Sequence, residues 1–124
     1  MSEYRIKKHP ILAIPALEKI NFFWQGTPLS AKSGETISAA LFANGIRIFG
    51  HHHKDGSPQG IFCANGQCSQ CMVIANSRPV KSCMELVEKD MQVEPADGFP
   101  SLPVTTTVPS TRPIEEITVE VLII

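Results

Sequence analysis

The chain has 124 residues, a formal net charge of -1 and 43% hydrophobic residues. This length predicts a single main domain that can bury a core without disulfide bonds. The near-neutral charge argues against a nucleic-acid-binding protein and against attraction to an anionic membrane surface, because both depend on a strong positive field.

No stretch of the chain has the character of an export signal or a membrane span. Residues 1–9 lack the apolar centre of a signal peptide. The longest apolar runs, Ile11 to Leu17 and Val121 to Ile124, are too short to cross a bilayer. We therefore expect a cytoplasmic protein with no transmembrane segment.

Residues 1–18 are expected to form an irregular N-terminal arm. Pro10 and Pro15 prevent a regular helix there, although residues 9–12 are largely apolar. Two roles remain open for this arm. It packs on its own domain, or it docks on a partner protein.

Residues 19–32 are predicted to form a β-hairpin. Bulky side chains alternate through 19–24, Gln25-Gly26 is suited to a tight turn, and 27–32 returns as a second strand. Pro28 has no backbone N–H to donate, so the second strand is expected at an edge of the sheet.

A helix is predicted after Thr36, which is a suitable N-cap, and Asn44-Gly45 is suited to end it. The helix is expected to bury one stripe against the hairpin, made of Ile37, Ala40 and Leu41. Ile46 and Ile48 alternate and predict a short strand after the helix.

Three consecutive histidines, His51, His52 and His53, follow. Neighbouring side chains of an extended chain point to opposite faces, so three in a row do not converge on one ion. A role beside a metal centre, or at the surface, is the favoured interpretation.

All four cysteines of the chain fall between residues 63 and 83, in the order C-x4-C-x2-C followed by eleven residues and a last Cys. This spacing is that of plant-type [2Fe–2S] proteins. The predicted ligands of the cluster are Cys63, Cys68, Cys71 and Cys83. Gly60 and Gly66 are expected to give the cluster loop its backbone freedom, and Phe62 is expected to pack over the cluster and exclude water.

Cysteines in a protein of this kind have three other common uses. Structural zinc usually takes two closely spaced pairs, and here Cys83 stands alone. Disulfides are uncommon in intracellular proteins. A [4Fe–4S] centre usually has C-x2-C-x2-C, and Cys63 is too far from Cys68 for that. Zinc remains the main alternative.

Beyond the loop, 72–75 and 78–81 predict a second hairpin that brings Cys83 back towards Cys71, and Gln92-Val93 is a candidate final strand. Lys81 and Glu85 are interpreted as solvated charges. From Pro95 the chain is rich in proline, and 117–124 forms an apolar strand pattern. That strand either folds back or adds to a partner's sheet, and the partner is favoured.

The order hairpin, helix, strand, cluster loop, hairpin resembles the β-grasp of plant-type ferredoxins. The chain also resembles the small ferredoxin-like subunits of heteromeric FAD-dependent amine and amino-acid dehydrogenases. That group includes proline and hydroxyproline dehydrogenases, opine oxidases, hydrogen cyanide synthase and the N-terminal domain of the large sarcosine oxidase subunit. The matching residues are Arg5-Ile6, His9-Pro10-Ile11-Leu12, Gly34-Glu35-Thr36-Ile37, Ala39-Ala40-Leu41, Asn44-Gly45-Ile46, Pro58, Gly60-Ile61-Phe62-Cys63, Gly66, Cys68, Cys71 and Cys83.

Two positions depart from the family pattern without touching a ligand. Gln59 stands where members often have Arg, which removes a positive charge near the cluster, and Ser69 stands where plant-type loops often have Gly. The resemblance covers residues 5–95 and has no counterpart for the tail after Pro100.

The resemblance implies an α+β, β-grasp domain at 19–96, flanked by the arm at 1–18 and a Pro-rich tail at 97–124. It implies an electron-transfer subunit that takes electrons from FAD on a dehydrogenase or oxidase subunit. The sequence shows no nucleophile–base constellation, so no catalytic residues are expected on this chain. The substrate would be proline, hydroxyproline, sarcosine or a related amine. The chain itself lacks a G-x-G-x-x-G motif for FAD or NAD. A free ferredoxin shuttle and a zinc-stabilised module remain alternatives. An iron–sulfur subunit of the succinate dehydrogenase type would need further cysteines, and the chain has none.

Overall fold

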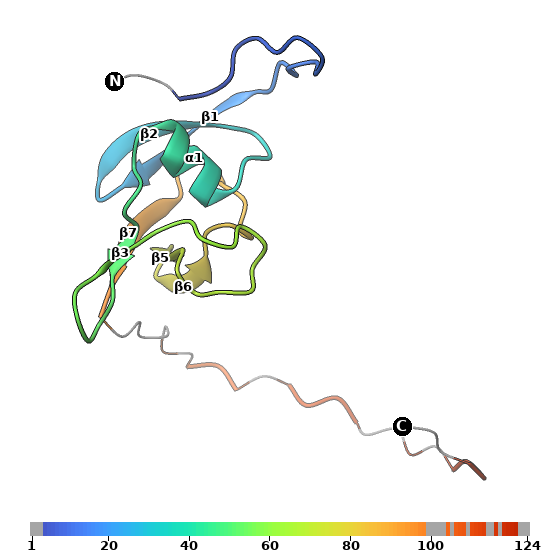
Figure 1. Ribbon diagram of the computed structural model, residues 1–124. Helices are drawn as coiled ribbons and strands as arrows, with labels where there is room; N and C mark the ends of the chain where they lie inside the picture. The colour runs from blue at the N-terminus through green and yellow to red at the C-terminus, as the bar shows by residue number, and fades with distance from the viewer. Residues whose placement is uncertain are drawn as a thin grey trace.

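The computed structural model describes residues 4–98 and, in the tail, residues 104, 106–108, 110–113, 116 and 118–121. It is a sheet-dominated α+β fold with one short helix (Figure 1). The elements in chain order are β1 Lys19–Trp24, β2 Thr27–Lys32, α1 Ile37–Ala43, β3 Gly50–His51, β4 Pro58–Gln59, β5 Met72–Ala75, β6 Arg78–Lys81 and β7 Gln92–Asp97.

Strand β7 joins the two halves of the sheet. It pairs in parallel with β1 near its start and with β3 near its end, and it pairs antiparallel with β5. β2 and β4 complete the order β2-β1-β7-β3-β4, and the β5–β6 hairpin branches from β7. The hairpin that follows the cluster loop is therefore held by the last strand of the domain.

The β1–β2 hairpin and the helix match the sequence prediction. The six register pairs of the hairpin run from Lys19 with Lys32 to Trp24 with Thr27, around the turn at Gln25-Gly26. Thr36 caps the helix by accepting a hydrogen bond from the backbone N–H of Ala39 at 3.3 Å. The predicted helix stripe is fully buried in the core: Ile37, Ala40 and Leu41.

The prediction of a strand at Ile46 and Ile48 is wrong, because the chain begins to pair only further on. Phe49 is fully buried, and its backbone N–H donates to the carbonyl of Gln59 at 2.7 Å. The Phe49 carbonyl accepts from the N–H of Ala96 at 3.0 Å. Burial of Phe49 therefore places the strand after it, at β3, and leaves Ile48 exposed.

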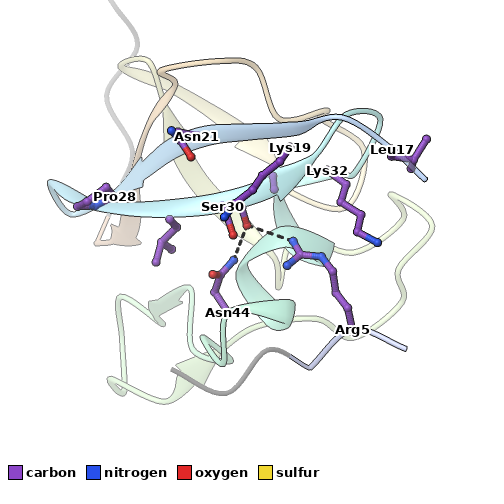
Figure 2. Close-up of a pocket in the computed structure, with 10 residues that line it drawn as sticks. Arg5, Leu17, Lys19, Asn21, Pro28, Ser30, Lys32 and Asn44 are labelled. Carbon is purple, nitrogen blue, oxygen red and sulfur yellow. Dashed lines mark hydrogen bonds between the residues drawn. The ribbon is translucent and has the colours of Figure 1, made fainter. Parts of the chain in front are cut away.

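β2 is an edge strand, as Pro28 predicts, and side chains cap its outer backbone groups. Arg5 and Asn44 both donate to the carbonyl oxygen of Ser30, at 3.1 and 2.9 Å (Figure 2). The N–H of Lys32 donates to the Glu35 carboxylate at 2.9 Å. These contacts cover carbonyl and N–H groups through which an open edge would pair with another chain.

The start of the N-terminal arm is fixed to the domain. Tyr4 donates its backbone N–H to the carbonyl of Ala43 at 2.9 Å. Arg5 forms a two-pronged ion pair with Glu35, with nitrogen–oxygen distances of 2.8 and 2.7 Å. Further along, Ile11 and Leu12 are exposed. The arm therefore packs on its own domain at its beginning and exposes apolar side chains beyond.

The Arg5–Glu35 pair should make stability depend on pH. Burial by itself raises the pKa of Glu35, but the hydrogen bonds and charges of Arg5 and Lys32 outweigh it and lower the pKa below its ordinary value. A lowered folded-state pKa gives stability that is present above the ordinary pKa and is lost as the pH falls through the folded one. We expect Arg5→Met to lower the free energy of unfolding by about 1 kcal/mol at neutral pH, measured in urea.

The difference between Arg5→Met and the parent chain should shrink as the solution is acidified through the Glu35 pKa. Asp97→Asn is the matched control, because its pair with His51 is about half exposed and contributes less than about 0.5 kcal/mol. A destabilisation by Arg5→Met that is the same in acid as at neutral pH would contradict this account.

In the described part of the chain, no helix combines the length and apolar character needed to cross a membrane. The described tail residues are exposed, and those between 118 and 121 are not in a strand. Ile117 and the last three residues lie outside the described part, so the strand predicted at 117–124 stays a prediction.

Candidate iron–sulfur site

The cluster loop runs from the end of β4 to the start of β5, and the backbone around Gly60 determines how it begins. A Cβ atom at Gly60 would collide with the backbone carbonyl oxygen of Arg47. Gly60 is therefore required for close approach of two backbone segments. Gly66 is required because of its backbone conformation: its φ of +80° is in the left-handed region. A Cβ there would also lie 2.9 Å from Met84 Cγ.

The structure brings the four cysteines together in two pairs. Cys68 lies near enough to Cys63 to help lower the pKa of Cys63, and Cys71 lies near enough to Cys83 to help raise the pKa of Cys83. Cys63 is close enough to Cys83 for their charges to interact. Cys71 and Cys83 are buried, whereas Cys63 and Cys68 are half-buried. One pair is thus set in the protein interior and the other faces outward.

The loop backbone favours a thiolate at Cys63. The sulfur of Cys63 accepts hydrogen bonds from the backbone N–H groups of Asn65 at 3.5 Å and Cys68 at 3.4 Å. These bonds lower the pKa of Cys63 to about 6, despite a small opposing effect of burial. The thiolate is the form that binds iron, so this half of the loop is prepared for a metal.

In the buried inner pair, Cys71 and Cys83, the surroundings shift the pKa of Cys83 in the opposite direction. Burial raises the pKa of Cys83, and contact with the Cys71 thiol adds to the effect. A bound metal removes the protons of such thiols, because its own charge outweighs the local preference. The N–H of Gly66 lies against Cys83 and acts in the direction of a lower pKa.

Ser82 ties the inner pair together, and the sequence analysis missed it. It is fully buried. Its hydroxyl donates to the carbonyl oxygen of Cys71 at 2.6 Å, and its backbone N–H donates to the same oxygen at 3.1 Å. In turn the Ser82 carbonyl accepts from the N–H of Ser38 at the start of α1. The sequence signal that could have identified Ser82 is its position: it is a polar residue between a predicted strand and a predicted cysteine ligand.

The paired arrangement fits a two-iron cluster. In a [2Fe–2S] centre with four cysteines, each iron takes two protein thiolates. Two neighbouring pairs of thiols are the set of ligands that two irons need.

Two predictions about neighbouring side chains are wrong. Phe62 does not pack over the cysteines, since 82% of it is exposed. Lys81 is not a freely solvated charge, because its ammonium group donates to the carbonyl oxygen of Gly66 at 2.6 Å. The path of the cluster loop explains both differences. It points Phe62 outward, and it brings the Gly66 carbonyl within hydrogen-bonding distance of Lys81.

The three histidines lie beside the cluster loop without forming a metal site among the described residues. Together with Ser69 and Gln70 of the loop they line an open cavity of about 330 Å³. His51 contacts Asp97 and His52 contacts Asp55, each at 3.0 Å. The interpretation of a surface role next to the metal centre is in keeping with these contacts.

A second cavity, of about 580 Å³, is lined by the N-terminal arm and the β1–β2 hairpin (Figure 2). None of its lining residues belongs to the cluster loop. It is therefore separate from the cysteines.

The sheet-dominated fold with one short helix and the cysteine-bearing loop define a ferredoxin-like [2Fe–2S] domain. The chain belongs to the 2Fe-2S iron-sulfur cluster binding domain family, whose model matches residues 18–98. The cofactor of this class is the [2Fe–2S] cluster, and the fold and cofactor predictions are confirmed at this level.

The relatives of the chain are parts of larger enzymes. It is 36% identical over 70 residues to hydrogen cyanide synthase subunit HcnA of Pseudomonas aeruginosa, covering 56% of this chain and 66% of that one. It is 25% identical over 107 residues to sarcosine oxidase subunit alpha of Rhizobium meliloti, covering 82% of this chain and 11% of that one. The chain thus spans about two thirds or less of these relatives.

Among solved structures, L-proline dehydrogenase from P. horikoshii is similar in fold. The TM-score is 0.62 at 19% identity, over 75% of this chain and 18% of that one. At this level of sequence identity the similarity is evidence for a shared fold only.

Proposed function

We propose that Cys63, Cys68, Cys71 and Cys83 hold a [2Fe–2S] cluster and that this chain is an electron-transfer subunit of a flavoenzyme complex. The observation that carries the proposal is the arrangement of four thiols in two neighbouring pairs, within a chain of a [2Fe–2S]-binding family. The outer pair would bind one iron and the inner pair the other. The buried Ser82–Cys71 hydrogen bond and the pairing of β5 with β6 fix the backbone around the inner pair.

A [2Fe–2S] cluster accepts one electron at a time, whereas a reduced flavin carries two. The role of this chain is then to hold the acceptor, to exclude water from the Cys71 and Cys83 side, and to present the Cys63 and Cys68 side to a partner. The burial of the two pairs supports this division.

The partner that best suits the chain is an FAD-bearing subunit that oxidises an amino acid or a secondary amine. Named relatives and a fold neighbour come from hydrogen cyanide synthase, sarcosine oxidase and L-proline dehydrogenase. Proline, hydroxyproline and sarcosine are therefore the substrates to test first. The near-neutral net charge of -1 also favours a docked subunit over a shuttle that is steered by charge.

The exposed apolar side chains next to the cysteines support docking. Phe62, directly before Cys63, and Met84, directly after Cys83, are largely exposed, and Leu86 is more than half exposed. Apolar side chains of this size at the outer end of a redox centre are typical of a surface that a partner covers.

The test is purification of the native complex without air, from cells that express this chain with an affinity tag. We expect a flavoprotein to be retained, and an electron-spin signal of a reduced [2Fe–2S] centre to appear when proline, hydroxyproline or sarcosine is added. A monomer that exchanges electrons with many reductases would instead indicate a free ferredoxin. A colourless protein with one zinc per chain would refute the proposal.

Phe62→Ser should weaken the complex without harming the cluster. Loss of an exposed aromatic anchor from an interface typically costs more than 1 kcal/mol, which is about a tenfold loss of affinity. The measurement is the dissociation constant for the flavoprotein subunit, together with the visible spectrum of the variant. Leu17→Ser is the matched control, because Leu17 is also part-exposed but lines the cavity beside β1 and β2. Equal affinity for Phe62→Ser and the parent chain would exclude this surface.

A further inference from the structure

Lys81, the last residue of β6, reaches across to the cluster loop. Its Nζ donates to the carbonyl oxygen of Gly66 at 2.6 Å, a contact between residues fifteen positions apart. The side chain is half-buried rather than extended into solvent. Lys81 is a cation two residues before Cys83, and the Gly66 that it contacts is three residues after Cys63 in the loop.

Gly66 is held from three directions at this point. Lys81 binds its carbonyl oxygen. The Met84 side chain lies so close that a Cβ on Gly66 would be 2.9 Å from Cγ and 3.0 Å from Sδ. The Gly66 N–H lies against the Cys83 sulfur. The orientation of this one residue therefore links the loop that carries three cysteines to the β5–β6 hairpin and to the fourth cysteine, which follows that hairpin.

We propose that Lys81 is a positioning residue which fastens the cluster loop through Gly66 and places a fixed positive charge beside the [2Fe–2S] cluster, raising its reduction potential. The inference rests on the proposed cluster site. It goes further by assigning to one side chain both the closure of the loop and part of the tuning of the centre.

The electrostatic reason concerns the charge of the cluster. Four thiolates and two sulfides outweigh the charge of the two irons, and reduction adds one more negative charge. A nearby ammonium group stabilises the reduced form more than the oxidised form, and hydrogen bonding and net charge around a cluster are known determinants of its potential. Lys81 is a cation that bonds directly to the cluster loop.

The first experiment measures the midpoint potential of the full chain loaded with its cluster, by reductive titration followed by electron-spin resonance. For Lys81→Met we expect the equilibrium constant for reduction to fall about tenfold, which is about 59 mV for one electron. Lys81→Arg keeps the charge and a donor, and should stay near the parent value. Lys19→Met is the control, because it removes the same charge from β1, a strand that does not pair with the β5–β6 hairpin.

The second experiment needs no cluster. Amide hydrogen exchange of the metal-free chain should be faster between residues 64 and 68 in Lys81→Met than in Lys81→Arg or Lys19→Met. This measures the fastening of the loop itself. If Lys81→Met does not take up iron, Lys81→Gln, which keeps a donor but no charge, replaces it in the titration.

An unchanged potential in Lys81→Met or Lys81→Gln, or unchanged exchange in the loop, would overturn the corresponding half of the inference. If the parent chain takes up no [2Fe–2S] cluster, the proposed function fails and the role in tuning fails with it. Fast loop exchange in Lys81→Met would still show that the fastening is real, so the two failures are distinguishable.

Discussion

Cys71→Ser is expected to abolish cluster binding. Cys71 is 2% exposed, lies near Cys83 and is anchored through Ser82. A serine hydroxyl is similar in shape but shorter, and it is a harder ligand that is not readily deprotonated, whereas iron–sulfur chemistry requires soft thiolates. Iron content, measured after anaerobic reconstitution, should fall from about two per chain to near zero, and the visible absorption should disappear with it.

Ser69→Ala is the control for Cys71→Ser. Ser69 is exposed and lies between Cys68 and Cys71 in the same loop, so its replacement changes the loop without removing a proposed ligand. We expect full iron content in this variant. A Cys71→Ser protein that keeps about two irons per chain would show that the inner pair does not hold the cluster. Zinc in place of iron in the parent chain would point to the zinc-stabilised module instead.

Gly60→Ala is expected to cause the second largest effect, on stability and on the cluster loop together. Its new methyl group would collide with the backbone carbonyl oxygen of Arg47, and a backbone atom cannot turn aside as a flexible side chain can. Overpacking of this kind typically costs about 2 kcal/mol. In a domain of this size that corresponds to a melting temperature lower by about 10 °C, which thermal unfolding followed by circular dichroism would detect.

Gly56→Ala separates the collision from the general effect of adding a methyl group. Gly56 has a φ of +68°, but a Cβ there meets no atom within 4 Å. Its cost is therefore the conformational strain alone, about 1 kcal/mol. If Gly60→Ala lowers the melting temperature no more than Gly56→Ala does, the close approach of residues 47 and 60 is not important for the fold.

The local elements were accessible from the sequence because each depends on neighbours in the chain. Alternation through 19–24, the apolar run at 72–75, the Gln25-Gly26 turn and the Thr36 cap are short-range signals, and each element lies where they place it. The strand wrongly predicted at Ile46 and Ile48 shows the limit. Alternation was present there, but the pairing partner was not, and burial of Phe49 moved the strand onward.

The central position of β7 in the sheet could not be predicted from local sequence patterns. Only Gln92-Val93 was predicted as strand, yet β7 continues through Pro95 to Asp97 and joins three other strands. Pro95 is tolerated because its partner contact with Val73 is at the boundary of the β5 pairing. The position of a strand in a sheet depends on contacts between distant segments, which no local pattern records.

The amino-acid sequence by itself determined the chemistry: four cysteines at a spacing that suits two irons, in a chain of the [2Fe–2S]-binding family. Tertiary structure alone decided how these groups are arranged. It paired the thiols, buried Ser82 beneath them, turned Phe62 outward and drew Lys81 onto Gly66. The physical reason is that residue type sets which bonds an atom can form, whereas burial and direction arise only when segments far apart in the chain pack together.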